Sequence, residues 1–232
     1  MVVVISAGCS ALDNLLGGGV RLGMLTDIFG AAGTGKTQIC FQLCVNCAKP
    51  KNRKGLGASV LFIDATNTFR PERVSQMAEY AGLDGGGGDN NKILDKIYVS
   101  RVYNTKEEMA AIKRMPQIRD LKLVIIDSIG DLFALEYKES MGAEKHLRFM
   151  RFLHELALYA INSNIAIVVT NGVRFSGGEQ AVQHLDRSVS TYVHFKIQLA
   201  KQDGVFRALL LQPSLQPREA FFKVADKGIE DV

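Results

Sequence analysis

The chain has 232 residues, a length that suits one large α/β domain or at most two small ones. Apolar residues make up 47% of it, which is ample for a core and excludes global disorder. The net charge of +4 permits nucleic acid as a partner but does not require it. No apolar run reaches the roughly 18 residues of a membrane span, and the N-terminus lacks the basic region of a signal peptide. We therefore expect a cytoplasmic protein without a membrane partner.

The first elements precede a glycine-rich segment. Residues 5–16 predict a short strand or turn followed by a helix, with Ser10 as its N-cap and Asp13 as the acidic partner of that cap. Three consecutive glycines, residues 17–19, end this helix. Residues 24–29 then predict a short apolar strand, and residues 38–48 predict a helix.

Between that strand and that helix lies the sequence G-A-A-G-T-G-K-T, residues 30–37. It matches G-x-x-x-x-G-K-[ST], the phosphate-binding loop, whose glycines let backbone N–H groups close around phosphate oxygens. Lys36 is placed to reach the β- and γ-phosphates, and the Thr37 hydroxyl is placed to ligate Mg²⁺. The N-terminus of the following helix also points at the phosphates. The pattern is specific in this strand–helix context, and it predicts a nucleotide site that starts at Gly30.

Three cysteines on the following helix have two possible interpretations. Cys40, Cys44 and Cys47 form C-x₃-C-x₂-C, a spacing also found in some iron–sulfur sites. On a helix they share one face, and cysteine is among the most buried residue types. We favour core packing, because a cluster needs its thiolates on a turn that wraps it, usually with a fourth ligand.

Strands and helices alternate along the middle of the chain. Apolar runs without alternation are typical of parallel strands that are covered on both faces. Thr105 is the predicted cap of one helix, with Glu108 as its partner. The last helix has a predicted apolar stripe of Leu147, Met150, Leu153, Leu156, Ala157 and Ala160. Residues 173–187 are polar and irregular. The predicted strands are residues 59–63, 97–102, 121–126 and 165–170, the helices are residues 71–81, 105–115 and 144–160, and antiparallel edge strands are residues 192–201, 205–212 and 220–225.

This order predicts an α/β fold, an open, mostly parallel twisted sheet with helices on both faces and antiparallel C-terminal edge strands. Ligands of such sheets bind at the carboxyl ends of the strands. Gly30, Asp64, Asp127 and Thr170 fall at such ends and should converge on one site. Asp127 follows the apolar run of residues 121–126 and is the predicted Mg²⁺-side acid opposite Thr37.

Five segments carry a resemblance to a known family. They are I-S-A-G (residues 5–8), L-D-N-L-L-G-G-G (12–19), D-A-T-N-T-F-R-P-E-R (64–73), V-V-T-N (168–171) and K-G-I-E-D (227–231). Together they resemble the ATPase core of RecA-family recombinases of the archaeal RadA/RadB type. The resemblance covers nearly the whole chain and implies one RecA-like P-loop NTPase core over residues 1–232. The helix-hairpin-helix domain and Phe-containing linker of RadA have no counterpart, so the chain is similar to RadB.

The resemblance implies roles for individual residues. The nucleotide site would consist of Gly30, Gly33, Thr34, Gly35, Lys36, Thr37 and Gln38, with Arg73 against the adenine. Thr37 and Asp127 would hold Mg²⁺, and Lys36 is the candidate catalytic residue. ATP and Mg²⁺ are thus the implied cofactors.

Other positions depart from the family pattern. Thr66 stands where the family has the glutamate that orients the attacking water, and a threonine hydroxyl is a poor base near neutral pH. Gly172 stands where the family has the glutamine that senses the γ-phosphate. Leu211 stands where an acid caps ATP across the protomer interface, and Ala134 occupies a place in the first DNA loop where the family has an arginine. The comparison implies ATP binding with weak or absent hydrolysis.

Three functions stay open. The first is a RadB-like accessory protein of homologous recombination and DNA repair that binds single-stranded DNA and acts on or beside the main recombinase. The second is an active DNA-dependent ATPase and strand-exchange recombinase, in which Glu72 or Asp64 would replace the missing glutamate. The third is a KaiC-like regulatory ATP-binding module without DNA. The candidate DNA contacts, for which an ordinary solvated charge is the alternative, are Lys138, Lys145, Arg148, Arg174 and Arg187.

Overall fold

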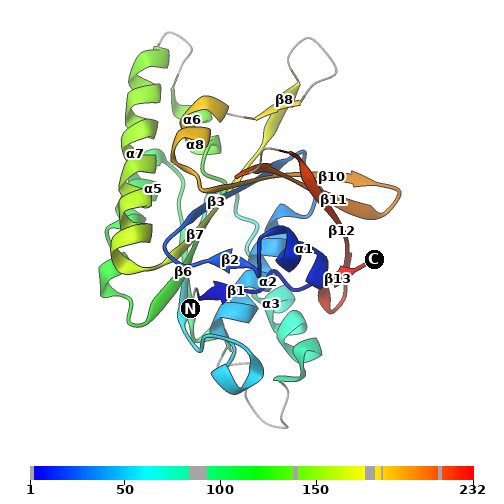
Figure 1. Cartoon of the computed structure of the whole chain (residues 1–232). Helices are drawn as coiled ribbons and strands as arrows, with labels where there is room; N and C mark the ends of the chain where they lie inside the picture. Colours follow the sequence, from blue (N-terminus) through cyan, green and yellow to red (C-terminus); the bar gives the residue numbers. More distant parts are fainter. Residues whose placement is uncertain (1–2, 84–92, 138–140, 176–180, 184, 214–215) are drawn as a thin grey trace.

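The computed structural model describes residues 3–83, 93–137, 141–175, 181–183, 185–213 and 216–232. For residues 174, 175, 181–183, 186 and 187 only the backbone is described. Figure 1 shows the described chain with most of its elements labelled.

A nine-stranded sheet forms the centre of the fold, in the order β13-β12-β11-β10-β3-β7-β6-β4-β5 (Figure 1). The strands from β10 to β5 in this order are parallel, and β10 to β13 pair antiparallel along the other edge. The predicted fold class is therefore confirmed. The strands are β3 (Leu25–Gly30), β4 (Ser59–Asp64), β5 (Ile97–Arg101), β6 (Leu121–Asp127), β7 (Ala166–Asn171), β10 (Phe195–Gln202), β11 (Val205–Gln212), β12 (Arg218–Ala225) and β13 (Gly228–Asp231).

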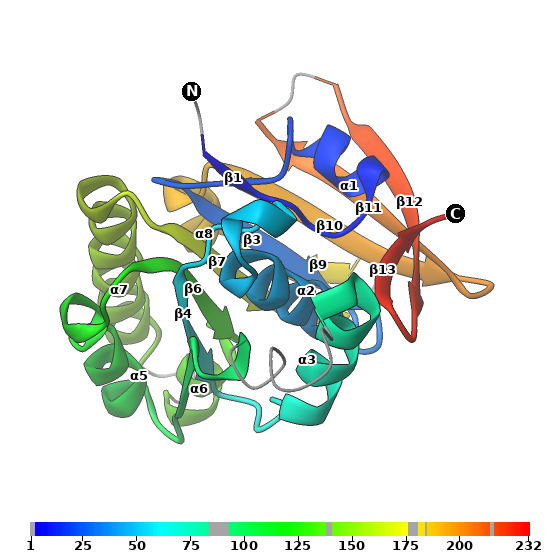
Figure 2. The same cartoon turned by 90° about the horizontal axis from the view of Figure 1, so that it is seen from below.

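Helices cover both faces of this sheet (Figure 2). One face carries α1 (Ser10–Leu15), α2 (Lys36–Ala48) and α3 (Pro71–Ala78). The other carries α5 (Thr105–Ile112), α6 (Asp131–Glu136), α7 (Gly142–Ser163) and α8 (Asp186–Tyr192). Shorter elements are the pairs β1 (Val4–Ile5) with β2 (Val20–Arg21) and β8 (Val173–Phe175) with β9 (Ala181–Gln183), and the single turns Lys51–Arg53, Glu79–Leu83 and Met115–Gln117.

The central strands are buried on both faces, as their apolar runs predict. Every residue of β3 and β7 is buried, and alternate residues of each strand enter the two separate cores on either side of the sheet. Cys40, Cys44 and Cys47 lie fully buried on α2 in the first core, and burial raises the pKa of the Cys47 thiol to about 12. These side chains stay protonated and pack against the sheet, which supports core packing over a metal cluster.

Two helix caps differ from the prediction. The N-cap of α5 is Asn104, whose Oδ1 accepts a hydrogen bond from the Glu107 amide at 2.8 Å, so Thr105 lies inside the helix. Helix α1 begins at Ser10, and its first amides donate to the carboxylate of Asp231 from the far end of the chain. Sequence-local capping rules could not find a cap that comes from another element.

Helix α7 buries part of the predicted stripe and two residues outside it. Leu153, Leu156 and Ala160 are fully buried as predicted, Phe149 and Phe152 are fully buried as well, and Leu147 is 52% exposed. The larger aromatic side chains lie in the interface because they bury more apolar surface than leucine does. Within the described residues, α7 and the other helices are too short or too polar to cross a membrane.

Candidate nucleotide-binding site

The polar residues at the strand ends converge as predicted. Asp64 at the end of β4 is the register partner of Asp127 at the end of β6, and Phe29 at the end of β3 is the partner of Asn171 at the end of β7. The loop that follows β3 therefore faces the carboxyl ends of its neighbours. This edge is where ligands of open α/β sheets bind.

The phosphate loop has the conformation that its glycines allow. Gly33 and Gly35 have φ values of +78° and +89°, in the left-handed region that residues with a Cβ rarely adopt. Gly30 is needed for a different reason: a Cβ there would lie 2.4 Å from the carbonyl oxygen of Leu199 on β10. The loop is thus fixed by backbone torsion at two glycines and by close strand packing at the third.

Lys36 is the first residue of α2, and its ammonium folds across the loop. Nζ donates to the carbonyl oxygens of Gly30 and Ala31, each at 2.8 Å. Burial lowers the pKa of Lys36, and the carboxylates of Asp127 and Asp131 oppose that shift. The side chain is a half-buried cation at the mouth of the loop, in the position that a phosphate-binding lysine requires.

The predicted Mg²⁺ pair is in contact. Thr37 Oγ1 donates to Asp127 Oδ2 at 2.8 Å, although the two residues are 90 positions apart. The hydroxyl of Thr170 donates to the other oxygen of Asp127. Burial raises the pKa of Asp127, while these two hydrogen bonds act in the opposite direction. A hydroxyl and a carboxylate side by side fit a hard cation that keeps most of its waters.

Arg73 joins the site to the C-terminal hairpin. Its Nε donates to Oε1 of Gln38 at 2.9 Å, and its terminal nitrogens donate to the carbonyl oxygens of Ala225 and Asp226 at 2.6 and 2.7 Å. It also donates to Gln76 on its own helix. The residue predicted to lie against the adenine therefore also fixes the β12–β13 turn against α2 and α3.

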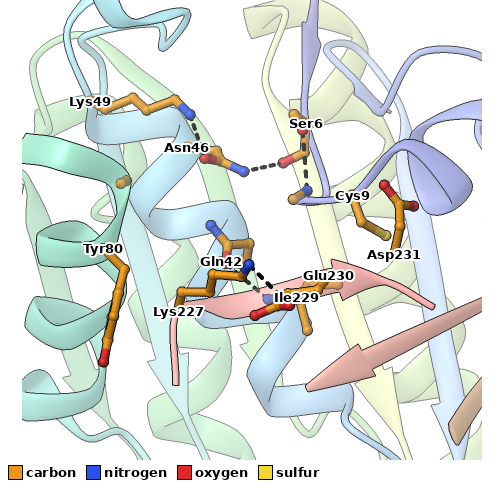
Figure 3. Close-up of a pocket in the computed structure, with 12 residues that line it drawn as sticks. Ser6, Cys9, Gln42, Asn46, Lys49, Tyr80, Lys227, Ile229, Glu230 and Asp231 are labelled. Atoms are coloured by element: carbon orange, nitrogen blue, oxygen red, sulfur yellow. Dashed lines mark hydrogen bonds and ion pairs between the residues drawn. The ribbon is translucent and has the colours of Figure 1, made fainter. Parts of the chain in front are cut away.

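Two cavities border these elements. One, of about 500 Å³, lies between the phosphate loop and β10 and is lined by residues 30–34, Val173 and residues 198–201. The other, also about 500 Å³, lies between α2, the N-terminal segment and the C-terminal strand β13 (Figure 3). There Asn46 donates to the Ser6 carbonyl and Gln42 accepts from the Ile229 amide, so polar side chains of α2 connect both chain ends. The first cavity borders the phosphate loop, and the second lies along the contact between α2 and the two ends of the chain.

Thr66 and Gly172 lie at this edge, whereas Leu211 lies toward the opposite edge, because β11 runs antiparallel to β10. The Thr66 hydroxyl lies 2.7 Å from that of Thr68 and is exposed. A Cβ at Gly172 would find a single neighbour within 4 Å, Oδ1 of Asp131. Leu211 is partly buried on β11. Asp64 is unsuited to replace the missing glutamate, because its carboxylate accepts from the amides of Thr66, Thr68 and Phe69.

Two acids near this edge have no predicted role in the site. Asp131 is the first residue of α6, and Glu108 on α5 is fully buried. No hydrogen-bond partner for either Glu108 oxygen is found in the described chain, and burial together with the charges of Asp131 and Glu136 raises the pKa of Glu108 well above its ordinary value. The position of Asp131, four residues after Asp127, could have indicated it, whereas the capping pattern assigned Glu108 to the helix that begins at Thr105.

Of the predicted DNA contacts, the structure describes two in full. Lys145 is half-buried and Arg148 exposed in the first turns of α7. Arg148 pairs with Glu144 at 3.0 Å and lies over the ring of Tyr137. Lys138 lies outside the described residues, and Arg174 and Arg187 are described by backbone alone, on β8 and α8.

Comparison with known proteins gives the family of this site. The family model described as Rad51 matches residues 1–232, the whole chain. The chain belongs to the Rad51 family. It is 34% identical to each of three proteins named "DNA repair and recombination protein RadA", from Cenarchaeum symbiosum, Metallosphaera sedula and Methanococcus voltae, over 98% of its own length. It spans 58%, 72% and 76% of these relatives.

Rad51-family membership explains the arrangement of sheet and loop but leaves the departures as features of this chain. The phosphate loop and the Thr37–Asp127 contact are present, and threonine and glycine stand at positions 66 and 172. In the described residues no group of three or more His, Cys, Asp or Glu side chains is arranged to hold a metal. The Thr37–Asp127 pair is the arrangement that fits Mg²⁺ in the company of a nucleotide.

Proposed function

We propose that this Rad51-family chain is a RadB-like, ATP-binding accessory protein of homologous recombination and DNA repair. It binds single-stranded DNA and modulates the main recombinase, and it hydrolyses ATP slowly or not at all. One observation carries the proposal: Lys36, Thr37 and Asp127 are in place around an intact loop, whereas Thr66 cannot act as a base.

The proposed binding mode follows from the loop. The β- and γ-phosphates would lie against the backbone amides of residues 33–37 and the Lys36 ammonium, at the N-terminus of α2. Thr37 and Asp127 would hold Mg²⁺, which neutralises phosphate charge when bound. Gln38 and Arg73 would border the base, since their side chains are joined at the start of α2 and α3.

The DNA-binding surface is proposed on α7 and the segments around it. Lys145 and Arg148 lie on the first turns of this helix, beyond the carboxyl ends of the sheet strands. Backbone contacts of this kind are electrostatic, so binding should weaken as salt rises, with a slope of about −0.7 per neutralised phosphate on single strands. The sequence also offers Lys138, Arg174 and Arg187 as candidates for DNA contacts.

Fluorescence anisotropy with a labelled single-stranded oligonucleotide tests this function. We expect salt-sensitive binding that weakens in Lys145→Ala and Arg148→Ala. Arg119→Ala is the matched control, because Arg119 is exposed, pairs with Asp120 and precedes the first residue of β6, away from the candidate site. Binding that is absent at low salt, with and without ATP, would instead favour a KaiC-like regulatory module.

A further inference from the structure

One carboxylate at the edge of the candidate site has no assigned role. Asp131 opens α6, four residues after Asp127 at the end of β6, and is half-buried. Its negative charge acts on the Lys36 ammonium together with that of Asp127. Asp131 therefore lies in the field of the residue proposed to bind the terminal phosphates.

The space beside Asp131 is left open by a missing side chain. Gly172 follows β7 at the same sheet edge, and a Cβ built on it would face Oδ1 of Asp131 at 4.0 Å, with no other neighbour that near. A glutamine at position 172 would extend toward this carboxylate. In this chain, the gap between β7 and α6 is bordered by the acid instead.

Three other acids near this edge are already engaged, whereas Glu72 in the first turn of α3 is exposed. Asp127 accepts from Thr37 and Thr170, and Asp64 accepts from three backbone amides of its own turn. Glu136 accepts from the amide and hydroxyl of Thr105. Within the described chain no hydrogen bond to the Asp131 carboxylate is found, so its oxygens are available to a water molecule.

Glu108 shapes the surroundings of Asp131. It is fully buried, and burial together with the charges of Asp131 and Glu136 raises its pKa well above the ordinary value. The raised pKa disfavours a second buried negative charge near Asp131. Because Glu108 is fully buried, we expect it to influence the site through Asp131 rather than by contacting a nucleotide.

Resting on the proposed ATP site, we propose that Asp131 accepts the proton of the attacking water in slow ATP hydrolysis, beside the gap at Gly172. The water oxygen bonds to the γ-phosphorus, and the bond from that phosphorus to the β–γ bridging oxygen breaks. ADP leaves with the electron pair, and an Asp131 oxygen takes the water proton. The residue would supply from α6 the base that Thr66, in the turn after β4, cannot supply.

The experiment measures ATP turnover and ATP affinity separately in the full chain. Asp131→Asn keeps the shape and removes the base. We expect its turnover to fall to the background of Lys36→Ala, while its affinity for ATP, measured by calorimetry, stays at the wild-type value. Asp120→Asn is the matched control, since Asp120 is exposed, pairs with Arg119 and lies just before the first residue of β6, away from the candidate site. It should leave turnover unchanged.

A second substitution distinguishes chemistry from structure. Thr66→Glu restores a carboxylate at the end of β4, and we expect it to recover turnover in the Asp131→Asn background. A purely structural role for Asp131 would lower ATP affinity and the unfolding temperature together with turnover, and Thr66→Glu would not repair these. If Asp131→Asn does not fold, Asp131→Ser, which suits a helix start, provides the same comparison.

The outcomes separate this inference from the function it rests on. Wild-type turnover no greater than that of Lys36→Ala, or turnover that Asp131→Asn does not reduce, overturns the role of Asp131 even if ATP binds. No ATP binding by the wild-type chain overturns the proposed function itself.

Discussion

Arg73 offers the sharpest prediction for stability, because one side chain connects three elements. In the structure its guanidinium donates to Gln38 on α2, to Gln76 on α3 and to the carbonyl oxygens of Ala225 and Asp226 in the β12–β13 turn. The perturbation is Arg73→Ala, which removes all of these donors. The two carbonyl oxygens of the hairpin then lose the partner that holds them against the helices.

The expected loss follows from the number and exposure of these bonds. A hydrogen bond from a charged donor contributes about 1.5–3 kcal/mol when well buried. Arg73 is half-exposed and its bonds share one side chain, so they do not add, and we expect a total of about 2 kcal/mol. For a chain of this size that corresponds to a fall of roughly 4–8 °C in unfolding temperature.

Urea unfolding and hydrogen exchange of the hairpin measure this loss. Arg70→Ala is the control, because Arg70 is exposed and donates to two carbonyl oxygens of its own segment, those of Asn67 and Phe69. We expect faster exchange at the amides of residues 225–231 in Arg73→Ala and little change in Arg70→Ala. Equal stability of the two variants, with unaltered hairpin exchange, would refute the reasoning.

Two further substitutions probe the site by its packing and its charge. In Gly130→Ala the new Cβ would lie 2.8 Å from Oδ1 of the buried Asn171, so we expect urea unfolding to show a loss of about 1–3 kcal/mol. Gly142→Ala is the control, because a Cβ there has nothing within 4 Å and should cost nothing. Equal losses in the two variants would contradict the steric argument. The raised pKa of Glu108 means that the native state holds a proton which the unfolded chain releases, so wild-type stability should fall as pH rises above about 4.5, by up to about 1.4 kcal/mol per pH unit. Glu108→Gln should flatten this part of the pH profile, and an unchanged slope would show that Glu108 is ionised in the fold.

The sheet and the nucleotide loop could be predicted because their signals are local. Apolar runs without alternation mark strands buried on both faces, and the phosphate-loop pattern is a contiguous segment between a strand and a helix. The Thr37–Asp127 contact could also be predicted, since parallel strand ends meet at one edge. These inferences need only the order of the elements along the chain and the pattern of apolar residues within them.

Features that depend on distant partners were missed. Asp231 caps α1 from the opposite end of the chain, and the buried face of α7 includes Phe149 and Phe152, which the predicted stripe did not, while Leu147 is exposed. Glu108 matched a capping pattern, yet it is fully buried on α5 and affected by the charge of Asp131. Tertiary packing decided each of these, and a local pattern contains no information about it.

The central claim is that the loop at residues 30–37 binds ATP in a Rad51-family core. Titration calorimetry of Mg²⁺–ATP into the wild-type chain and Lys36→Ala tests it most directly. We predict saturable binding at one site per chain in the wild type and a loss of at least about tenfold in affinity, or 1.4 kcal/mol, in Lys36→Ala. Equal affinity in both proteins, or no binding in the wild type, would contradict the assignment of this site.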